Sequence, residues 1–148
     1  HILSLNVDKS WRRKAVKRLK KPVAEVQNPM ILDVACGTAD STIRIARSIE
    51  NAEILGLDIS EKMLEIGEEK VKKLGLESSI KFHNSCAENI DFQDDTFDAV
   101  FVAFGVRNFE DRMKGLGEIL RVLKHDGSLF VLELSEPQNV IVRWFYNL

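Results

Sequence analysis

Five short apolar segments that alternate with stretches of helical periodicity restrict the fold of this chain more than any other feature. The segments are residues 30–34, 54–58, 80–82, 97–103 and 128–134. Each is typical of a strand buried on both faces, because it is short, nearly continuous in apolar residues and close to turn residues. Strands that alternate with helices need right-handed crossovers, so the sequence predicts an α/β fold, with a mostly parallel sheet and helices on both faces.

The intervening segments carry helix signals. The first is predicted to be capped by Asp40 or Ser41, and the second by Ser60, with a stop at Gly75. Asp126-Gly127 predicts a turn before the last strand. The expected apolar faces are Ile43, Ile45, Ala46 and Ile49 for the first helix, Met63, Leu64, Ile66, Val71 and Leu74 for the second, and Met113, Leu116, Ile119, Leu120 and Leu123 for the third.

The net charge of −2 conceals an uneven distribution. Residues 1–22 carry a net charge of +7, and the remaining 126 residues carry −9. Apolar residues from Val7 to Leu19 share one helical face and Pro22 ends the pattern, so we predict a basic amphipathic N-terminal helix over 1–22 and a second unit over 23–148. Two interpretations of the N-terminal helix remain. We favour the one in which its apolar face packs on the sheet; in the other, residues 7–21 rest on an anionic membrane surface.

Composition excludes several classes of protein. No run approaches the roughly 18 apolar residues of a membrane-spanning helix, and no leader peptide opens the chain. Cys36 and Cys86 are too few for a disulfide framework and lack the paired spacing of a zinc site, so we expect a cytoplasmic protein without a metal. We also expect no nucleic-acid partner. The chain starts at His1 without a methionine and stops just after an aromatic cluster, so we expect it to be incomplete at both ends.

Ligands of such sheets bind at the carboxyl ends of the strands, so the loops there carry the functional signal. The loop of residues 33–40 contains Gly37 among small residues, which lets a ligand approach the backbone. Asp58 follows 21 residues later, at the end of the second strand, where a carboxylate can accept both hydroxyls of a ribose. The two features predict a nucleoside cofactor; the alternative is a tight turn beside a capping carboxylate.

The glycine count distinguishes between two such cofactors. Aligned on the dinucleotide pattern G-x-G-x-x-G, the loop has Ala35, Gly37 and Asp40 at the three glycine positions, so only one glycine is present. Asp40 would also place a negative carboxylate beside the negative pyrophosphate of NAD. S-adenosylmethionine has no phosphate and carries a sulfonium and an ammonium group, which Asp33 and Asp40 tolerate. The sequence therefore favours S-adenosylmethionine over NAD.

Two later loops complete the predicted site. Residues 85–88 follow the third strand, where Cys86 either meets the adenine or is a small buried hydrophobic residue. Residues 103–108 begin at the end of the fourth strand and present Arg107 and Asn108 side by side at the cofactor edge.

These segments together resemble the ubiquinone/menaquinone biosynthesis C-methyltransferase family. The matching motifs are residues 31–40, Leu57-Asp58-Ile59-Ser60 with Met63-Leu64, Thr96-Phe97-Asp98, Phe104-Gly105-Val106-Arg107-Asn108, residues 121–124, and Leu132-Glu133-Leu134-Ser135-x-Pro137. The resemblance implies a Rossmann-like class I methyltransferase fold that lacks its last strands here. The cofactor contacts predicted from the loops and the resemblance are Asp33, Gly37, Thr38, Asp58, Ile59, Met63, Cys86, Ala87 and Ala103.

The resemblance also implies a reaction. A methyl group would pass from S-adenosylmethionine to a ring carbon of a prenylated quinol, namely from demethylmenaquinol to menaquinol. Arg107 would stabilise the phenolate and Asn108 would orient the ring. The alternatives are a class I methyltransferase for another small molecule, an NAD-dependent oxidoreductase, and a non-catalytic nucleoside-binding module. The sequence departs from the family where Ala39 replaces the usual glycine and Cys86 the usual Asp or Asn, which predicts weakened cofactor affinity.

Overall fold

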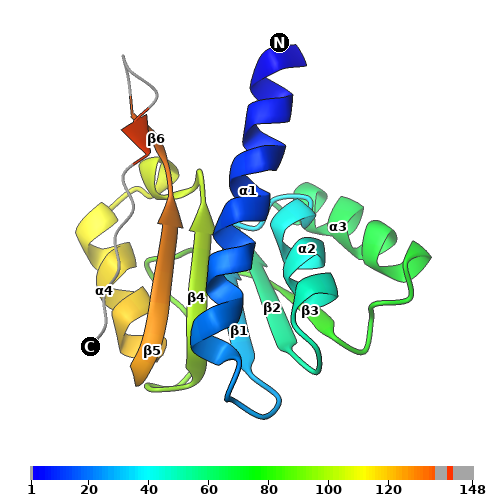
Figure 1. The fold of residues 1–148 in the computed structure, drawn as a ribbon. Helices are drawn as coiled ribbons and strands as arrows, with labels where there is room; N and C mark the ends of the chain where they lie inside the picture. The colour runs from blue at the N-terminus through cyan, green and yellow to red at the C-terminus, as the bar shows by residue number, and fades with distance from the viewer. Residues whose placement is uncertain (1, 136–139, 142–148) are drawn as a thin grey trace.

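The structure is a computed structural model that describes the backbone of residues 2–135 and 140–141 and the side chains of residues 8–133 (Figure 1). Pro137, the last residue of the family motifs, lies outside these ranges. The order of elements is α1 (Ile2–Val23), β1 (Met30–Val34), α2 (Asp40–Ser48), β2 (Glu53–Asp58), α3 (Glu61–Lys73), β3 (Ile80–Asn84), β4 (Phe97–Ala103), the 3-10 helix η1 (Val106–Asn108), α4 (Arg112–Val122), β5 (Leu123–Leu132), β6 (Leu134–Ser135) and β7 (Val140–Ile141).

The five predicted strands form one sheet in the order β3-β2-β1-β4-β5, and every neighbouring pair is parallel. The predicted α/β fold with a parallel sheet is therefore confirmed. β6 and β7 form a separate antiparallel pair. Within the described residues, β3 and β5 are the outer strands of the five-stranded sheet. The chain order reverses at β1, which lies between β2 and β4, so a ligand site is expected at the carboxyl end of β1.

Helices cover both faces of the sheet (Figure 1). The strand residues of one face pack with α1, α2 and α3 around Ile31, Ile45 and Phe101. Those of the other face pack with α4 and the β3–β4 connection around Leu32, Val100 and Ile119. Successive side chains of a strand point to opposite faces, which is why Ile31 and Leu32 lie in different cores.

The N-terminal helix packs on the sheet. Val16, Leu19 and Val23 of α1 are at most 2% exposed and belong to the core shared with α2. This confirms the packed interpretation of its apolar face. The helix runs past Pro22 to Val23, one residue beyond the predicted stop. Within the described residues, no helix is long and apolar enough to cross a membrane.

Three predictions about the helices are wrong in detail. The residue before α2 is Ala39, in a left-handed conformation, and no side chain caps the helix; Ser60 does cap α3, as predicted. The sets of residues that α3 and α4 bury are smaller than expected, because each helix contacts the sheet along one side only. The predicted core positions that the structure instead exposes are Met63, Ile66, Leu74, Met113 and Leu120.

The last strand begins earlier than predicted. β5 starts at Leu123, which pairs with Phe97, and the register then shifts so that Ala99 pairs with Ser128. The predicted Asp126-Gly127 turn is therefore an irregularity inside β5. A local turn signal does not reveal that strand pairing continues on both of its sides.

Candidate functional site

A cavity of about 500 Å³ opens at the carboxyl ends of the central strands. Its walls come from the ends of β1 and β2, from the loop after β3, from η1 and from the start of α4. The lining residues are Val34, Ala35, Leu57, Asp58, Ile59, Ser85, Cys86, Ala87, Glu88, Asn89, Gly105, Asn108, Phe109, Glu110 and Lys114.

Asp58 joins three segments at this cavity. One carboxylate oxygen accepts the backbone N–H of Gly37 at 2.8 Å, and the other accepts that of Ser60 at 2.9 Å. Each oxygen keeps a further lone pair for a ligand hydroxyl. Gly37 has φ +57°, and a Cβ there would meet nothing within 4 Å, so glycine is favoured by its backbone conformation and the space beside it is open.

Three residues in the loops after β1 and β4 have a left-handed backbone. Ala35, Ala39 and Phe104 have φ of 56°, 73° and 59°, although none of them is glycine. The left-handed region costs an L-residue roughly 1–2 kcal/mol. Such strain persists only where surrounding structure enforces it, and it is typical of functional loops.

Asp33 lies beneath the loop, not in the cavity. Its side chain is 1% exposed and accepts a hydrogen bond from Thr42 Oγ1 at 2.7 Å. Burial raises the pKa of Asp33 to about 7, although the Thr42 hydrogen bond opposes the shift. Burial also raises the pKa of the Cys36 thiol, which therefore stays neutral.

The shifted pKa of Asp33 predicts a pH-dependent stability. In the unfolded chain the group ionises near 3.8, and in the folded protein near 7, so between these values the folded state binds more protons. The free energy of unfolding should therefore fall as pH rises from about 4 to about 7, by an amount on the order of 4 kcal/mol. Urea unfolding across this range should show the slope in the parent and lose most of it in Asp33→Asn.

Asp126→Asn is the matched control, because Asp126 is an exposed carboxylate. The free energy of unfolding of this variant should fall with pH as steeply as that of the parent. A parent-like slope in Asp33→Asn would show that Asp33 ionises normally in the folded protein.

A lysine from α3 holds the loop after β1. Lys70 Nζ donates to the carbonyl oxygen of Thr38 at 3.0 Å, to Thr38 Oγ1 at 2.9 Å and to Asp40 Oδ1 at 2.9 Å. Arg12 of α1 reaches the other oxygen of Asp40 at 3.5 Å. Sequence reasoning missed Lys70, because it lies 32 residues from Thr38 on a helix with several other lysines.

The turn that carries Arg107 is also held by a remote residue. Glu133, just after β5, accepts the backbone N–H of Val106, the first residue of η1, at 2.8 Å. Arg107 and Asn108 follow in η1 and are both exposed. The signal that could have indicated Glu133 is a single charge inside the apolar run 129–134.

The predicted site residues fall into three groups. Asp58, Ile59, Cys86, Ala87 and Asn108 line the cavity together. Gly37 is bonded to Asp58, and Thr38 is held by Lys70. Neither Gly37 nor Thr38 lines the cavity itself. The other predicted residues outside its lining are Asp33, Met63, Ala103 and Arg107.

The fold and the cavity define a class: a Rossmann-like domain with a nucleoside-type site at the carboxyl edge of a parallel sheet. A family model described as "ubiE/COQ5 methyltransferase family" matches residues 1–148. The chain belongs to this family, as the resemblance predicted. A protein of Bacteroides fragilis named demethylmenaquinone methyltransferase is 45% identical over 100% of the chain, which spans 59% of that protein.

Solved structures show the same fold. An S-adenosylmethionine-dependent methyltransferase from Aquifex aeolicus superposes with a TM-score of 0.73 and 25% identity, over 83% of this chain and 65% of that one. The structure described as the [4+2]-cyclase SpnF has a TM-score of 0.75 and 26% identity, over 84% of this chain and 46% of that one. The fold therefore accommodates more than one reaction.

Membership of the family implies S-adenosylmethionine as the cofactor, and the cavity has a suitable chemistry for it. Asp58 supplies acceptors for a ribose, and the apolar surface of Ile59 and Ala87 suits a purine. Ser85 and Asn89 add polar groups on the same wall. The residues present therefore fit the cofactor.

Proposed function

We propose that the protein transfers a methyl group from S-adenosylmethionine to a ring carbon of a prenylated quinol, converting demethylmenaquinol to menaquinol. The observation that carries the proposal is that Asn108 of η1 lines the same cavity as Asp58, with the exposed Arg107 as its neighbour in η1. The Bacteroides fragilis relative, named for demethylmenaquinone, supports this choice of acceptor.

The cofactor contacts extend beyond the residues that line the cavity. Asp58 binds the ribose, Ile59 and Ala87 contact the adenine, and Cys86 completes that wall. The loop of residues 33–40 holds the remainder of the cofactor. The further proposed contacts are Gly37, Thr38, Met63 and Ala103, and Asp33, buried beneath the loop, would act on the cofactor through that loop.

In the proposed mechanism the cofactor supplies an electrophilic methyl group, and this chain prepares the nucleophile. A ring carbon is nucleophilic enough only when the neighbouring hydroxyl has lost its proton. Arg107 stabilises the resulting phenolate by its charge, and Asn108 orients the ring. Once methylated, the ring carbon would lose its proton to solvent and the phenolate oxygen would regain one, which restores the aromatic quinol.

We further propose that the protein works in the cytoplasm beside the membrane that contains its lipid-soluble acceptor. The apolar face of α1 packs on the sheet, so the basic side chains of residues 7–21 would make this contact. In this arrangement residues 1–22 are the membrane-facing helix and residues 23–148 the cofactor-binding domain. Sedimentation with anionic vesicles tests the role of α1 when the parent is compared with a variant in which the exposed Lys14, Lys17 and Arg18 are changed to Gln, because this change keeps the core residues of the helix. Equal binding of the two proteins would contradict the membrane contact.

Replacing Arg107 with alanine tests the mechanism. Turnover of demethylmenaquinol should fall at least tenfold, about 1.4 kcal/mol of transition-state stabilisation, because the phenolate loses its positive neighbour. The dissociation constant for S-adenosylmethionine should change little, since Arg107 does not line the cavity. Steady-state kinetics and calorimetry measure the two quantities separately.

The matched control is Arg112→Ala, which removes an exposed arginine just beyond η1. Its turnover should match the parent. Full activity in Arg107→Ala would remove this residue from the mechanism. Tight cofactor binding without methylation of any quinol would favour a methyltransferase for another small molecule or a non-catalytic nucleoside-binding module.

A further inference from the structure

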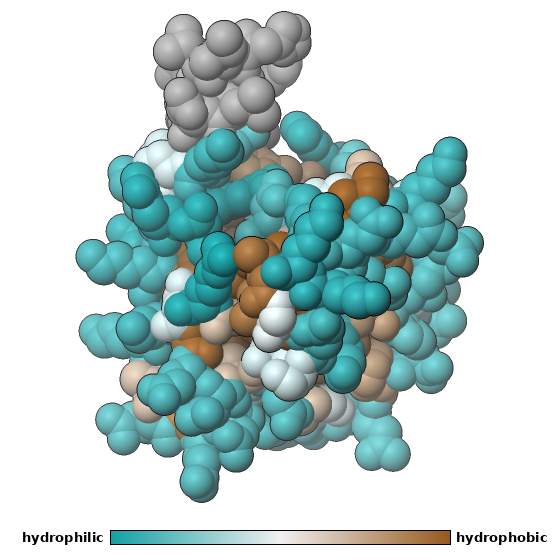
Figure 2. All heavy atoms as spheres, turned by 90° about the vertical axis from the view of Figure 1, so that its right-hand side faces the viewer, coloured by the Kyte–Doolittle hydropathy of each residue, from teal (hydrophilic) through white to brown (hydrophobic). Residues whose placement is uncertain are grey.

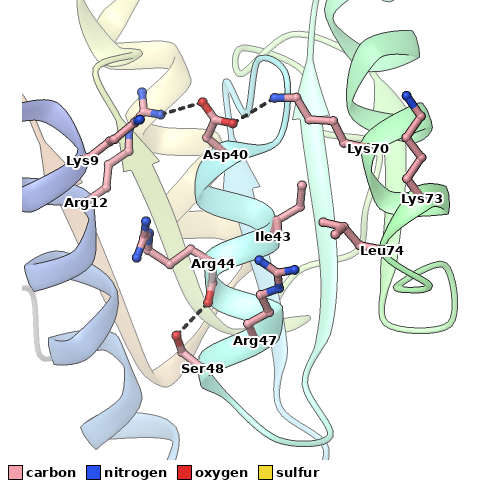
Figure 3. Close-up of a pocket in the computed structure, with 10 residues that line it drawn as sticks. All are labelled: Lys9, Arg12, Asp40, Ile43, Arg44, Arg47, Ser48, Lys70, Lys73 and Leu74. Carbon is pink, nitrogen blue, oxygen red and sulfur yellow. Dashed lines mark hydrogen bonds and ion pairs between the residues drawn. The ribbon is translucent and has the colours of Figure 1, made fainter. Parts of the chain in front are cut away.

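A second cavity, of about 530 Å³, lies on the helical layer and crosses α2 from α1 to α3 (Figure 3). Each of the three helices contributes two cations to this basic groove. They are Lys9 and Arg12 from α1, Arg44 and Arg47 from α2, and Lys70 and Lys73 from α3. Asp40 is the one carboxylate among the lining residues that the structure describes. The groove is thus strongly positive, although residues 23–148 are acidic overall.

The single carboxylate is already engaged. Asp40 pairs with Lys70 at 2.9 Å and with Arg12 at 3.5 Å, and both cations reach it in Figure 3. Among the side chains described for residues 8–133, no carboxylate forms an ion pair with the other cations, which are Lys9, Arg44, Arg47 and Lys73. Their mutual repulsion is a cost that a bound anion would relieve.

The shape and chemistry of the groove favour phosphate groups. Guanidinium groups bind phosphate oxygens through two parallel hydrogen bonds, and lysines add point charges. Ile43 and Leu74 give the groove apolar surface, which suits a carbon skeleton beside the phosphates. Figure 2 shows a mainly hydrophilic surface on the α3 side, with hydrophobic residues visible between the polar ones.

We propose that the basic groove binds a ligand that carries phosphate groups. Such a ligand can be the headgroup of an anionic phospholipid or a soluble pyrophosphate compound. No lining residue is shared with the cofactor cavity, although Asp40 and Lys70 also hold the loop after β1. The groove is therefore distinct from that cavity, and its anion binding does not depend on the proposed methyl transfer.

The test compares two triple variants with the parent. Arg44→Gln, Arg47→Gln and Lys73→Gln together neutralise the groove and leave the Asp40 contacts intact. Lys62→Gln, Lys81→Gln and Arg112→Gln remove the same charge from exposed positions outside the groove. One arm measures sedimentation with phosphatidylcholine vesicles with and without phosphatidylglycerol, and the other measures calorimetric binding of inorganic pyrophosphate.

We expect the parent and the control variant to bind at least one of these probes, and the groove variant to bind it at least about tenfold more weakly. Dependence on phosphatidylglycerol would indicate a lipid headgroup, and binding of pyrophosphate would indicate a soluble ligand. The proposal would be overturned if the groove variant and the control variant lost equal amounts of probe binding, or if the parent bound neither probe.

Folding is checked independently. The affinity for S-adenosylmethionine should be equal in the parent, the groove variant and the control variant. If the triple groove variant unfolds, the single change Arg44→Gln replaces it as a milder test. Arg47 and Lys73 lie in the last turns of their helices, where a cation is also stabilised by the helix dipole. If Arg47 and Lys73 only stabilised the ends of their helices, the groove variant would melt at a lower temperature. The parent would then show no anion binding that depends on the groove.

Discussion

Asp58→Ala should weaken S-adenosylmethionine binding about a hundredfold, equivalent to about 2.7 kcal/mol. The substitution removes the proposed acceptor of the ribose hydroxyls, and hydrogen bonds to a charged group contribute about 1.5–3 kcal/mol each. It also leaves the N–H groups of Gly37 and Ser60 without their acceptor, so the loop after β1 and the start of α3 are no longer joined. Isothermal calorimetry measures the affinity directly.

Asp98→Ala is the matched control for this prediction. Asp98 also accepts a backbone N–H at 2.8 Å, from Met30, and it pairs with Lys124, but it lies at the opposite end of the sheet. This variant should lose stability and keep its cofactor affinity. Equal cofactor affinity in the two variants would show that Asp58 acts only on stability and does not bind the ligand.

Gly105→Ala should lower the free energy of unfolding by about 2 kcal/mol, in the range that overpacking usually costs. A Cβ on Gly105 would lie 2.5 Å from the Cβ of Ala35, in the loop after β1. The added methyl group must push η1 away from that loop, so turnover should fall together with stability. Urea unfolding and steady-state kinetics measure the two losses.

Two variants control this prediction. Gly117→Ala adds a methyl group where nothing lies within 4 Å, on the exposed side of α4, and should stabilise the protein by about 0.5–1 kcal/mol. Adding Ala35→Gly to Gly105→Ala removes the opposing methyl group and should restore most of the lost stability. A double variant no more stable than Gly105→Ala would mean that the cost arises elsewhere.

Much of the fold could be predicted from local patterns. The bounds of β1 and β4 match the predicted strands residue for residue, because a buried parallel strand is marked by its own continuous apolar run. Ser60 caps α3 as expected, since a cap bond is made within three residues. Ala39 was missed as the residue before α2, because its left-handed backbone is enforced by surrounding structure and not by its own preference.

The site was less predictable than the fold. Asp58, Ile59, Cys86, Ala87 and Asn108 follow the strand ends that the pattern predicts, and they meet in one cavity because parallel strands end at one edge. The residues that hold this edge in place come from other elements. Lys70 reaches Thr38 from α3, and Glu133 reaches Val106 from the end of β5, which no spacing in the sequence reveals.

The sequence by itself determined the order of strands and helices, the carboxyl edge as the place for a ligand, and the carboxylate that ends the second strand. Apolar periodicity and turn residues are local properties, so one chain read in order is enough to find them. The tertiary structure alone decided that Asp33 is buried under the loop, and that cations from α1, α2 and α3 line one groove. Both depend on how elements distant in the sequence pack, because a side chain's exposure and charge partners are set by the neighbours that folding brings to it.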